Sequence, residues 1–463
     1  MALLATLGWA LFAFAGAYRW TIVPIFAGAL ATAVIVRPSI FRHPFRVLDF
    51  ALVLCVLVIA AQLIPLNPSV RAALSPSADR IERSLVFDLP DGRRPLSLDP
   101  VATGWALASG VSLLLIFWSA RSLFGRGGAV RSVSRWIGWF GLALAIVMFL
   151  QRSMTPGLIY GFWTPITRAS NPTPLGPFVN RNDIATWLMM ACPMVFGYLI
   201  ARVSSTLAEH GRVGIESLAD SRTVWLTATV CLMLGALLAS LSRSGLFGGT
   251  AAACIFAIVA SRRVSGSRMA LSLVGVGVLI AAASFYVNVS ALTERISNTL
   301  PSNLGGRLTV WHETWPMARD FPLTGIGVGA FEHAMLVYQQ STRLIFFNHA
   351  HDEYLQLLVE GGWLLTVPAL LVVAAALWAI IGRLRSDRTP IFWIRLGAVS
   401  GMAAVAAQSV WDTGLRMPAN AVLFAVVAAA AMFRTPVTPT SDAASSRRTT
   451  ADSAFAAGGR RIS

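Results

Sequence analysis

The sequence predicts an all-α protein that crosses a membrane about twelve times. Of its 463 residues, 56% are hydrophobic and only 13% are charged, whereas a soluble domain usually carries about 25% charged residues. Mean hydropathy is +0.66. This composition excludes an ordinary cytosolic enzyme and a disordered chain, because there is too little polar surface to cover a soluble fold of this length.

Apolar runs along the chain predict the membrane spans. A helix needs about 20 apolar residues to cross the hydrocarbon core. Twelve runs approach this length, at residues 2–18, 21–36, 48–65, 101–118, 134–150, 183–201, 223–241, 244–260, 269–288, 353–380, 392–411 and 417–433. No basic segment precedes the first run, which we therefore interpret as a retained helix rather than a signal peptide. The runs at 21–36 and 417–433 are short, so eleven spans are the alternative.

The placement of the positive charge predicts the orientation. The formal net charge is +16, and every basic residue is an arginine. Arginines are concentrated in the even-numbered loops and in the C-terminal tail, which the positive-inside rule assigns to the cytoplasm. Such a charge excess orients loops and does not indicate a nucleic-acid partner. The long loops at about 66–100, 151–182 and 289–352 then face outward, and the balanced charge of 66–100 predicts a solvated surface loop.

Four parts of the chain are expected. Residues 1–288 form an N-terminal bundle of nine transmembrane helices, 289–352 a large and partly helical periplasmic loop, 353–433 the C-terminal transmembrane helices, and 434–463 a disordered cytoplasmic tail. The four cysteines all lie in apolar runs, which predicts buried thiols and no disulfide framework. The sequence has no internal repeat of the kind that indicates many transporters.

Two outward-facing helix starts carry candidate ligand-binding residues. Asn182 or Asp183 is expected to cap the sixth span, beside Arg181, and a helix N-terminus favours anions. Arg243 lies in the turn Ser242–Gly245. It either extends to lipid head groups or points into an outward cavity, where an anionic ligand would offset the cost of placing it near hydrocarbon.

The longest outer loop begins with a predicted short helix. Arg307, Trp311 and Trp315 follow one another at intervals of four residues and therefore lie close to one face. The two tryptophans belong to an interfacial belt, pack a lipid tail or stack on a sugar ring. The glycine-alternating run at 322–331 is interpreted as a tight loop folded over the bundle, because no βαβ unit surrounds it as a nucleotide loop requires.

Two histidines lie where this loop re-enters the membrane. His349 and His351 precede Asp352, and either a structural or a general-base role fits such a position. The chain offers no obvious third zinc ligand, so no metal site and no cofactor are expected. Glu360 is expected to bond within the bundle. In the last outer hairpin, Asp412 pairs with Arg416 or orients a catalytic group.

Five ordered segments together resemble the bacterial O-antigen ligase and polymerase family of membrane glycosyltransferases. They are Gly176–Asp183, Ser242–Gly245, Arg307–Trp311 leading to Gly325–Phe331, His349–Gly362, and Ser409–Asn420. The resemblance implies a GT-C-like fold and a metal-independent, inverting transfer of a glycan from an undecaprenyl-diphosphate carrier. The acceptor is a glycan or a lipid, and the active site faces the periplasm from the bacterial inner membrane. Membrane lipids and other polysaccharide-assembly proteins are the further partners implied.

The resemblance also suggests roles for single residues. It places the functional arginines on Arg243 and Arg307 and the catalytic histidine on His351. The family usually has asparagine after this histidine, whereas this sequence has Asp352. Because of this departure, His349 is an alternative candidate for the catalytic histidine. A carboxylate beside His351 favours the imidazolium, so His351 either takes the acceptor's proton or helps to hold the diphosphate. The expected substrate-binding residues are Arg181, Asn182, Trp311, Trp315, Tyr354, Asp412 and Arg416.

Three functions remain open at this point. A lipid-linked glycan transferase is favoured, and within it a polymerase over a ligase, because the outer loops show no large separate acceptor-binding domain. A transporter is the first alternative, although its ionisable residues would be expected at mid-membrane rather than at the outer rim. The second alternative is an inactive scaffold in a polysaccharide-export complex. Asp352 in place of the family's usual asparagine is consistent with such a loss of activity.

Overall fold

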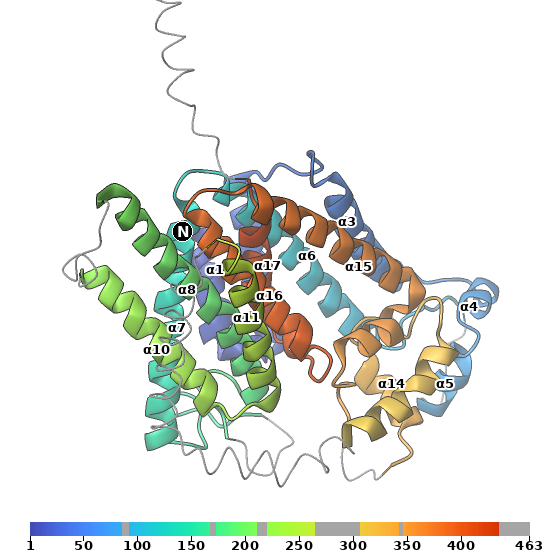
Figure 1. Cartoon of the computed structure of the whole chain (residues 1–463). Coiled ribbons are helices and arrows are strands. Elements are labelled where there is room, and N and C mark those ends of the chain that lie inside the picture. The colour runs from blue at the N-terminus through green and yellow to red at the C-terminus, as the bar shows by residue number, and fades with distance from the viewer. Residues whose placement is uncertain (86–91, 167–172, 211–219, 264–305, 342–345, 435–463) are drawn as a thin grey trace, which may run out of the picture.

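The computed structural model describes residues 1–85, 92–166, 173–210, 220–263, 306–341 and 346–434 (Figure 1). In these ranges every regular element is a helix, apart from isolated β-bridges such as that between Leu66 and Arg94. The all-α prediction is confirmed for this part of the chain. The predicted span 269–288 and the predicted tail from residue 435 onward lie outside the described residues.

The described residues include eight helices that are long and apolar enough to cross a membrane. They are the segment Arg19–Val36, which contains α2 (Ile22–Val36), then α6 (Pro100–Phe124), α7 (Ala129–Met154), α8 (Arg181–His210), α10 (Ser221–Ala239), α11 (Arg243–Ala260), α15 (Glu353–Ser386) and α16 (Ile391–Gln408). Other predicted runs contain three shorter helices, which are α1 (Ala2–Phe12), α3 (Arg46–Ala61) and α17 (Pro418–Met432). The chain is therefore a polytopic membrane protein, while the count of twelve stays a prediction.

The first predicted span is shorter than expected. The run at 2–18 was expected to be one helix, but α1 ends at Phe12. Phe14 and Ala15 both have φ of 55°, a left-handed conformation that an α-helix cannot contain. Hydrophobicity alone does not reveal such a turn, because the turn residues are as apolar as the helix.

The α8–α16 pair forms the centre of the bundle. Glycines let the two backbones approach closely: a Cβ on Gly197 would lie 2.1 Å from the carbonyl oxygen of Trp393, and one on Gly397 would lie 2.1 Å from that of Pro193. Small residues of this kind allow close helix packing in membranes. The pair carries Asn182 at the start of α8 and Gln408 at the end of α16 to the same end of the bundle. We call this the loop end.

A second, smaller core lies at the loop end. It joins α5 (Ala78–Leu85), the helix at 306–320 and α14 (Phe331–Tyr338), and ion pairs of Arg71 attach α4 (Pro68–Leu74) to α5 (Figure 1). The prediction of a solvated loop at 66–100 was wrong, because Arg71 there is buried between Asp79 and Glu82. Local charge balance did not reveal that these charges neutralise one another inside a packed unit. The two long loops share one end of the bundle, as loops on one side of a membrane must.

A glycine-rich loop fastens this second core to the bundle. The N–H of Ile326 donates to the carbonyl of Val359 at 3.0 Å, and that of Gly327 donates to the carbonyl of Glu360 at 3.0 Å. The helix α15 opens to receive the loop at Gly362, whose φ of 58° and ψ of −166° are not helical. Only glycine adopts such a conformation at low cost. The prediction of a tight loop folded over the bundle is confirmed.

Candidate active site at the loop end

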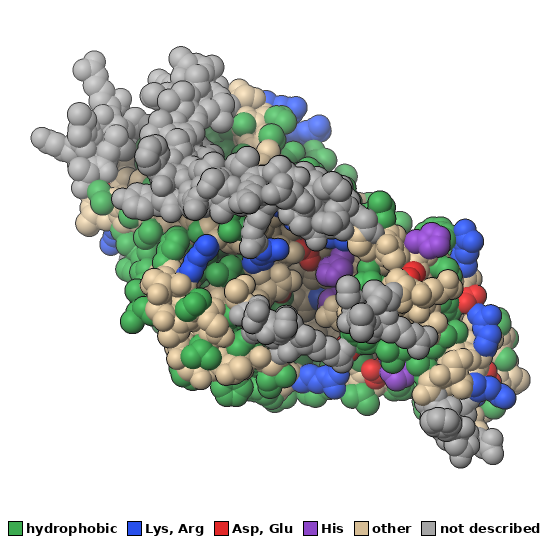
Figure 2. All heavy atoms as spheres, turned by 90° about the horizontal axis from the view of Figure 1, so that it is seen from below, with side chains coloured by type: hydrophobic (Ala, Val, Ile, Leu, Met, Phe, Trp, Pro, Cys, Tyr) green, Lys and Arg blue, Asp and Glu red, His purple; other side chains and the backbone are tan. Residues whose placement is uncertain are grey.

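Five segments bring polar side chains together at the loop end. They are the starts of α8, α11 and α15, the helix at 306–320, and the hairpin 409–417 between α16 and α17. Figure 2 looks onto this end of the molecule. Histidine, arginine and acidic side chains gather there around a hollow near the middle of the face. Sequence positions more than two hundred residues apart therefore contribute to one site.

The start of α11 is tied to the start of α8. Ser242 caps α11 by accepting a hydrogen bond from the N–H of Gly245 at 3.0 Å, and its hydroxyl donates to Oδ1 of Asn182 at 2.7 Å. The cap of α8 is Asn180, whose Oδ1 accepts from the N–H of Asn182 at 2.9 Å. The expected cap at Asn182 or Asp183 was thus wrong, because Asn182 is engaged by Ser242. This link fixes Arg243, the first residue of α11.

A buried polar chain supports the hairpin from below. Thr186 donates to Oε1 of Gln408 at 2.7 Å, Gln408 donates to Oγ of Ser244 at 3.2 Å, and Ser244 donates to Oδ2 of Asp412 at 3.2 Å. Sequence reasoning missed Gln408 and Thr186. The available signal was a glutamine at the end of an apolar span, since a buried amide needs partners.

His351 and Asp412 face one another across the site. Nδ1 of His351 lies 4.0 Å from Oδ1 of Asp412, which is too long for a hydrogen bond. Oδ1 of Asp412 accepts from the N–H of Thr413 at 2.9 Å. Burial alone would raise the pKa of the Asp412 carboxyl, but His351, Thr413 and Arg307 together hold that pKa below its ordinary value. Asp412 is therefore an ionised carboxylate directed at a histidine.

The backbone of His351 has an unusual conformation. Its φ is 54°, in the left-handed region that few residues other than glycine adopt. Its Nδ1 is buried and has no hydrogen-bond partner within the described ranges. Strained backbone and unsatisfied buried polar atoms are both concentrated at functional sites. These two features distinguish His351 from an ordinary structural histidine.

Arg243 and Arg307 supply unneutralised positive charge beside this pair. Burial lowers the pKa of Arg307, the nearby Asp412 acts to raise it, and Arg243 acts to lower it. The three charges are therefore close enough to influence one another. Within the described part of the chain, neither arginine forms an ion pair with a carboxylate. Two half-buried guanidinium groups that form no ion pair among the described residues are suited to an anion.

His349 has a different environment from His351. Its Nδ1 accepts a hydrogen bond from Nε2 of Gln356 at 3.3 Å, so its proton lies on the other ring nitrogen. Burial, followed by the charges of Arg416 and His351, lowers the pKa of His349 to about 3. His349 is thus neutral, and its only basic nitrogen is already occupied. This arrangement suits a structural residue rather than a base.

Arg416 belongs to a partly buried ion-pair network. Its guanidinium lies 2.8 Å from Oε2 of Glu360 and 3.3 Å from Oε1 of Glu353. Of the two roles left open for Asp412, the pair with Arg416 does not form, because α15 presents two carboxylates to Arg416 that sequence proximity could not reveal. The prediction that Glu360 bonds within the bundle is confirmed. Arg416 therefore holds the hairpin against the start of α15 and fixes Asp412 relative to His351.

The comparison with known proteins adds one observation to this geometry. Residues 228–370 match the family model of the O-antigen ligases. The predicted resemblance to the O-antigen ligase and polymerase family is thereby confirmed. No curated protein matches the chain.

The segment that matches the O-antigen ligase model contains Arg243, Arg307, His349 and His351. Asp412 and the start of α8 lie outside the matched residues, and the fold brings them to the same place.

Among the described residues, no three His, Cys, Asp or Glu side chains converge as a metal site would require. The four cysteines are free, but Cys254 is exposed, so the prediction that all of them are buried was wrong.

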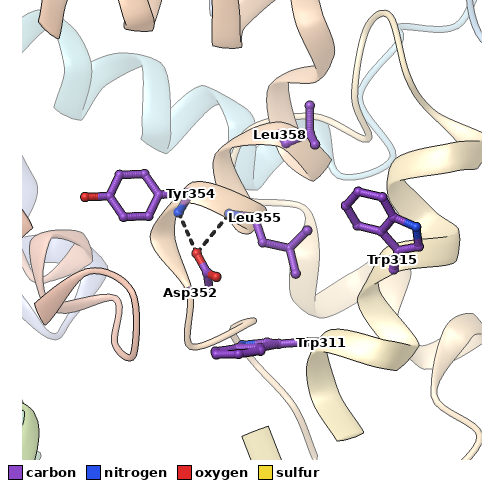
Figure 3. A pocket seen from close by; sticks show the side chains of 6 residues that line it. All are labelled: Trp311, Trp315, Asp352, Tyr354, Leu355 and Leu358. Atoms are coloured by element: carbon purple, nitrogen blue, oxygen red, sulfur yellow. Dashed lines mark hydrogen bonds between the residues drawn. The ribbon is translucent and has the colours of Figure 1, made fainter. Parts of the chain in front are cut away.

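The remaining predicted substrate-binding residues lie at the start of α8 or around an open pocket. Arg181 is exposed at the first position of α8. Trp311, Trp315, Asp352, Tyr354, Leu355 and Leu358 line an open pocket of about 470 Å³ (Figure 3). The Tyr354 ring points away from the two tryptophans in this view, and its hydroxyl donates to the carbonyl of Ala406 at 2.8 Å. Tyr354 therefore contributes to the pocket wall without offering its ring or its hydroxyl.

Proposed function

We propose that the protein transfers a glycan from an undecaprenyl-diphosphate carrier to a hydroxyl group of a glycan or lipid acceptor. The reaction takes place at the periplasmic face of the inner membrane, in O-antigen or exopolysaccharide assembly. The observation that carries this proposal is the arrangement of two unpaired arginines, Arg243 and Arg307, beside the His351–Asp412 pair. The match to the O-antigen ligases supports the same class of substrate.

The position of Arg243 supports a phosphate ligand. It is the first residue of α11, where the positive end of the helix dipole disfavours a cation. Arg307 adds a second positive charge nearby. Such an arrangement lowers stability unless an anion occupies it, and a diphosphate supplies oxygens for both guanidinium groups. The N-terminus of α11 and the guanidinium groups of Arg243 and Arg307 then all bind the same diphosphate.

The transfer is a displacement at the anomeric carbon of the donor glycan. The acceptor oxygen attacks this carbon, and the bond from the carbon to the phosphate oxygen breaks. The electron pair leaves with the undecaprenyl diphosphate, whose charge becomes more negative in the transition state. Arg243 and Arg307 stabilise this charge, and removing one such preorganised donor typically costs roughly 10²–10³ in kcat. A single displacement inverts the configuration at the anomeric carbon.

His351 takes the proton of the acceptor hydroxyl. Asp412 orients the ring through Nδ1 and stabilises the imidazolium, which leaves Nε2 as the base, as in other carboxylate–histidine pairs. The 4.0 Å separation of the two groups must shorten in the reacting complex, as catalytic contacts often do. The arginines provide the positive charge at the leaving group, so the proposed step uses no metal and no cofactor.

Polymerisation of repeat units is favoured over ligation of a finished chain. The described outer segments form one small packed core and no separate acceptor-binding domain. A deletion strain tests the proposal when its surface glycan is separated on a gel. Loss of long chains with a single repeat retained indicates a polymerase, and accumulation of long lipid-linked chains indicates a ligase. An unchanged glycan profile would contradict the transferase proposal.

A further inference from the structure

We propose that the open pocket between the helix at 306–320 and the start of α15 binds a sugar ring of the acceptor glycan. The inference rests on the transferase function proposed above and assigns the acceptor to one place beside the base. Its walls are Trp311 and Trp315 on one helix and Leu355 and Leu358 on the other (Figure 3). Its volume of about 470 Å³ lies in the range of pockets for small ligands, and its open side lets a chain continue outward.

Trp315 offers a flat apolar surface to this pocket. Its side chain is 46% exposed, although it lies on a helix of the loop end rather than on a membrane span. No aromatic ring of the described residues stacks on it, and the guanidinium of Arg319 lies 5.9 Å from its ring centroid. One face of a pyranose ring presents mainly C–H groups, and an indole face of this kind is suited to cover it.

Asp352 makes the pocket selective for a ligand with hydroxyl groups. Its Oδ1 accepts from the N–H groups of Tyr354 and Leu355, at 2.9 and 3.0 Å, and so caps α15. Its Oδ2 has no hydrogen-bond partner in the described part of the chain. A free carboxylate oxygen accepts hydrogen bonds from sugar hydroxyls, repels a phosphate group and gains nothing from a hydrocarbon chain. This chemistry favours a glycan over a lipid tail or the diphosphate.

The position of the pocket relative to His351 assigns it to the acceptor. Asp352 follows the proposed base directly in the chain. Trp311 donates from Nε1 to the carbonyl of Ala350 at 3.0 Å, so the same tryptophan that lines the pocket also holds the loop carrying His351. The ring bound here is therefore next to the group that takes the proton. That ring, or its neighbour in the glycan, carries the attacking hydroxyl.

Kinetics of Trp315→Ala test this assignment in the full-length protein reconstituted in liposomes. The acceptor KM should rise about tenfold, the order expected from losing one ring-stacking contact. The kcat at saturating acceptor and the donor KM should not change. Trp315→Phe should recover part of the loss. Trp378→Ala, at a tryptophan on α15 that is 65% exposed, is the matched control and should leave all three constants unchanged.

A binding measurement separates this inference from the transferase proposal. Saturation-transfer NMR with the purified protein and the free acceptor oligosaccharide should show contact that Trp315→Ala removes and Arg307→Ala leaves in place. A donor KM that rises in Trp315→Ala, or an unchanged acceptor KM with undiminished NMR contact, would overturn the acceptor subsite and leave the transferase intact. Trp315-dependent binding in a protein that transfers nothing would overturn the transferase and retain a glycan-binding pocket.

Discussion

Nδ1 of His351 lies 4.0 Å from Oδ1 of Asp412, although 60 residues, including the whole of α15 and α16, separate the two positions along the chain. Asp412 is held from its other side by Ser244, at 3.2 Å. The carboxylate is therefore fixed, and the histidine lies on a loop in a left-handed conformation. The proposed mechanism requires this gap to close by about 1 Å when substrate binds.

The first prediction concerns Asp412. Asp412→Asn keeps the shape of the side chain and removes the charge that orients His351, so kcat should fall roughly 10²–10⁴-fold while the melting temperature changes little. Asp220→Asn is the matched control, because Asp220 forms an ion pair with Arg202 far from the site. Transfer rates in proteoliposomes measure the effect. Wild-type activity in Asp412→Asn would remove Asp412 from the mechanism.

The second prediction concerns the two unpaired arginines. Arg307→Lys keeps the positive charge but loses the guanidinium fork that binds two phosphate oxygens at once, so transfer should fall roughly 10–10³-fold. Arg243→Ala should cause a similar or larger loss. Arg80→Lys, at an ion pair with Asp320 on the surface of the second core, should be near neutral. Full activity of both site variants at normal expression would refute diphosphate binding by these residues.

The third prediction distinguishes the two histidines. His351→Ala should abolish transfer and leave stability near that of the wild type, because Nδ1 of His351 makes no hydrogen bond within the described ranges. His349→Ala should mainly lower stability, since it breaks the contact to Gln356. Activity and melting temperature are measured on the same preparations. Normal transfer by His351→Ala together with inactive but stable His349→Ala would show that the roles are reversed.

The fourth prediction follows from the lowered pKa of His349. That pKa is about 3 in the folded protein against 6.5 for an ordinary histidine. Between these values the unfolded chain binds more protons, so His349 makes stability fall as the pH drops from about 6.5 towards 3. Melting curves in detergent should show this slope, and His349→Gln should reduce it. An equal slope in the variant would mean that His349 titrates as it does in the unfolded chain.

The fifth prediction concerns topology. A single cysteine at the exposed position Gln340 should react with an impermeant thiol reagent in intact spheroplasts, and one at Ser445 should not. The four native cysteines are first replaced by alanine, since all of them are free. Labelling of Ser445→Cys but not of Gln340→Cys would show that the orientation is opposite to the predicted one and that the proposed active site faces the cytoplasm.

Sequence reasoning predicted those features that depend on local composition. The helices α6 to α8, α10 and α11 lie at their predicted runs because length and hydropathy are local properties. Arg243, Arg307 and His351 were found through ordered motifs, and the fold brings them together. The partners of Arg416 and the polar chain through Gln408 were missed. These contacts join segments of distant sequence position, so only the tertiary packing determines them.

The most direct test of the proposed function is transfer by the purified protein in liposomes. The donor is the undecaprenyl-diphosphate-linked glycan of the source strain, radiolabelled in the sugar, and the acceptor is supplied separately. We predict that label moves to the acceptor while undecaprenyl diphosphate is released in equal amount, and that both processes stop in Arg307→Ala and His351→Ala. Absence of transfer by the folded wild-type protein, or transfer by the two variants at the wild-type rate, would contradict the account.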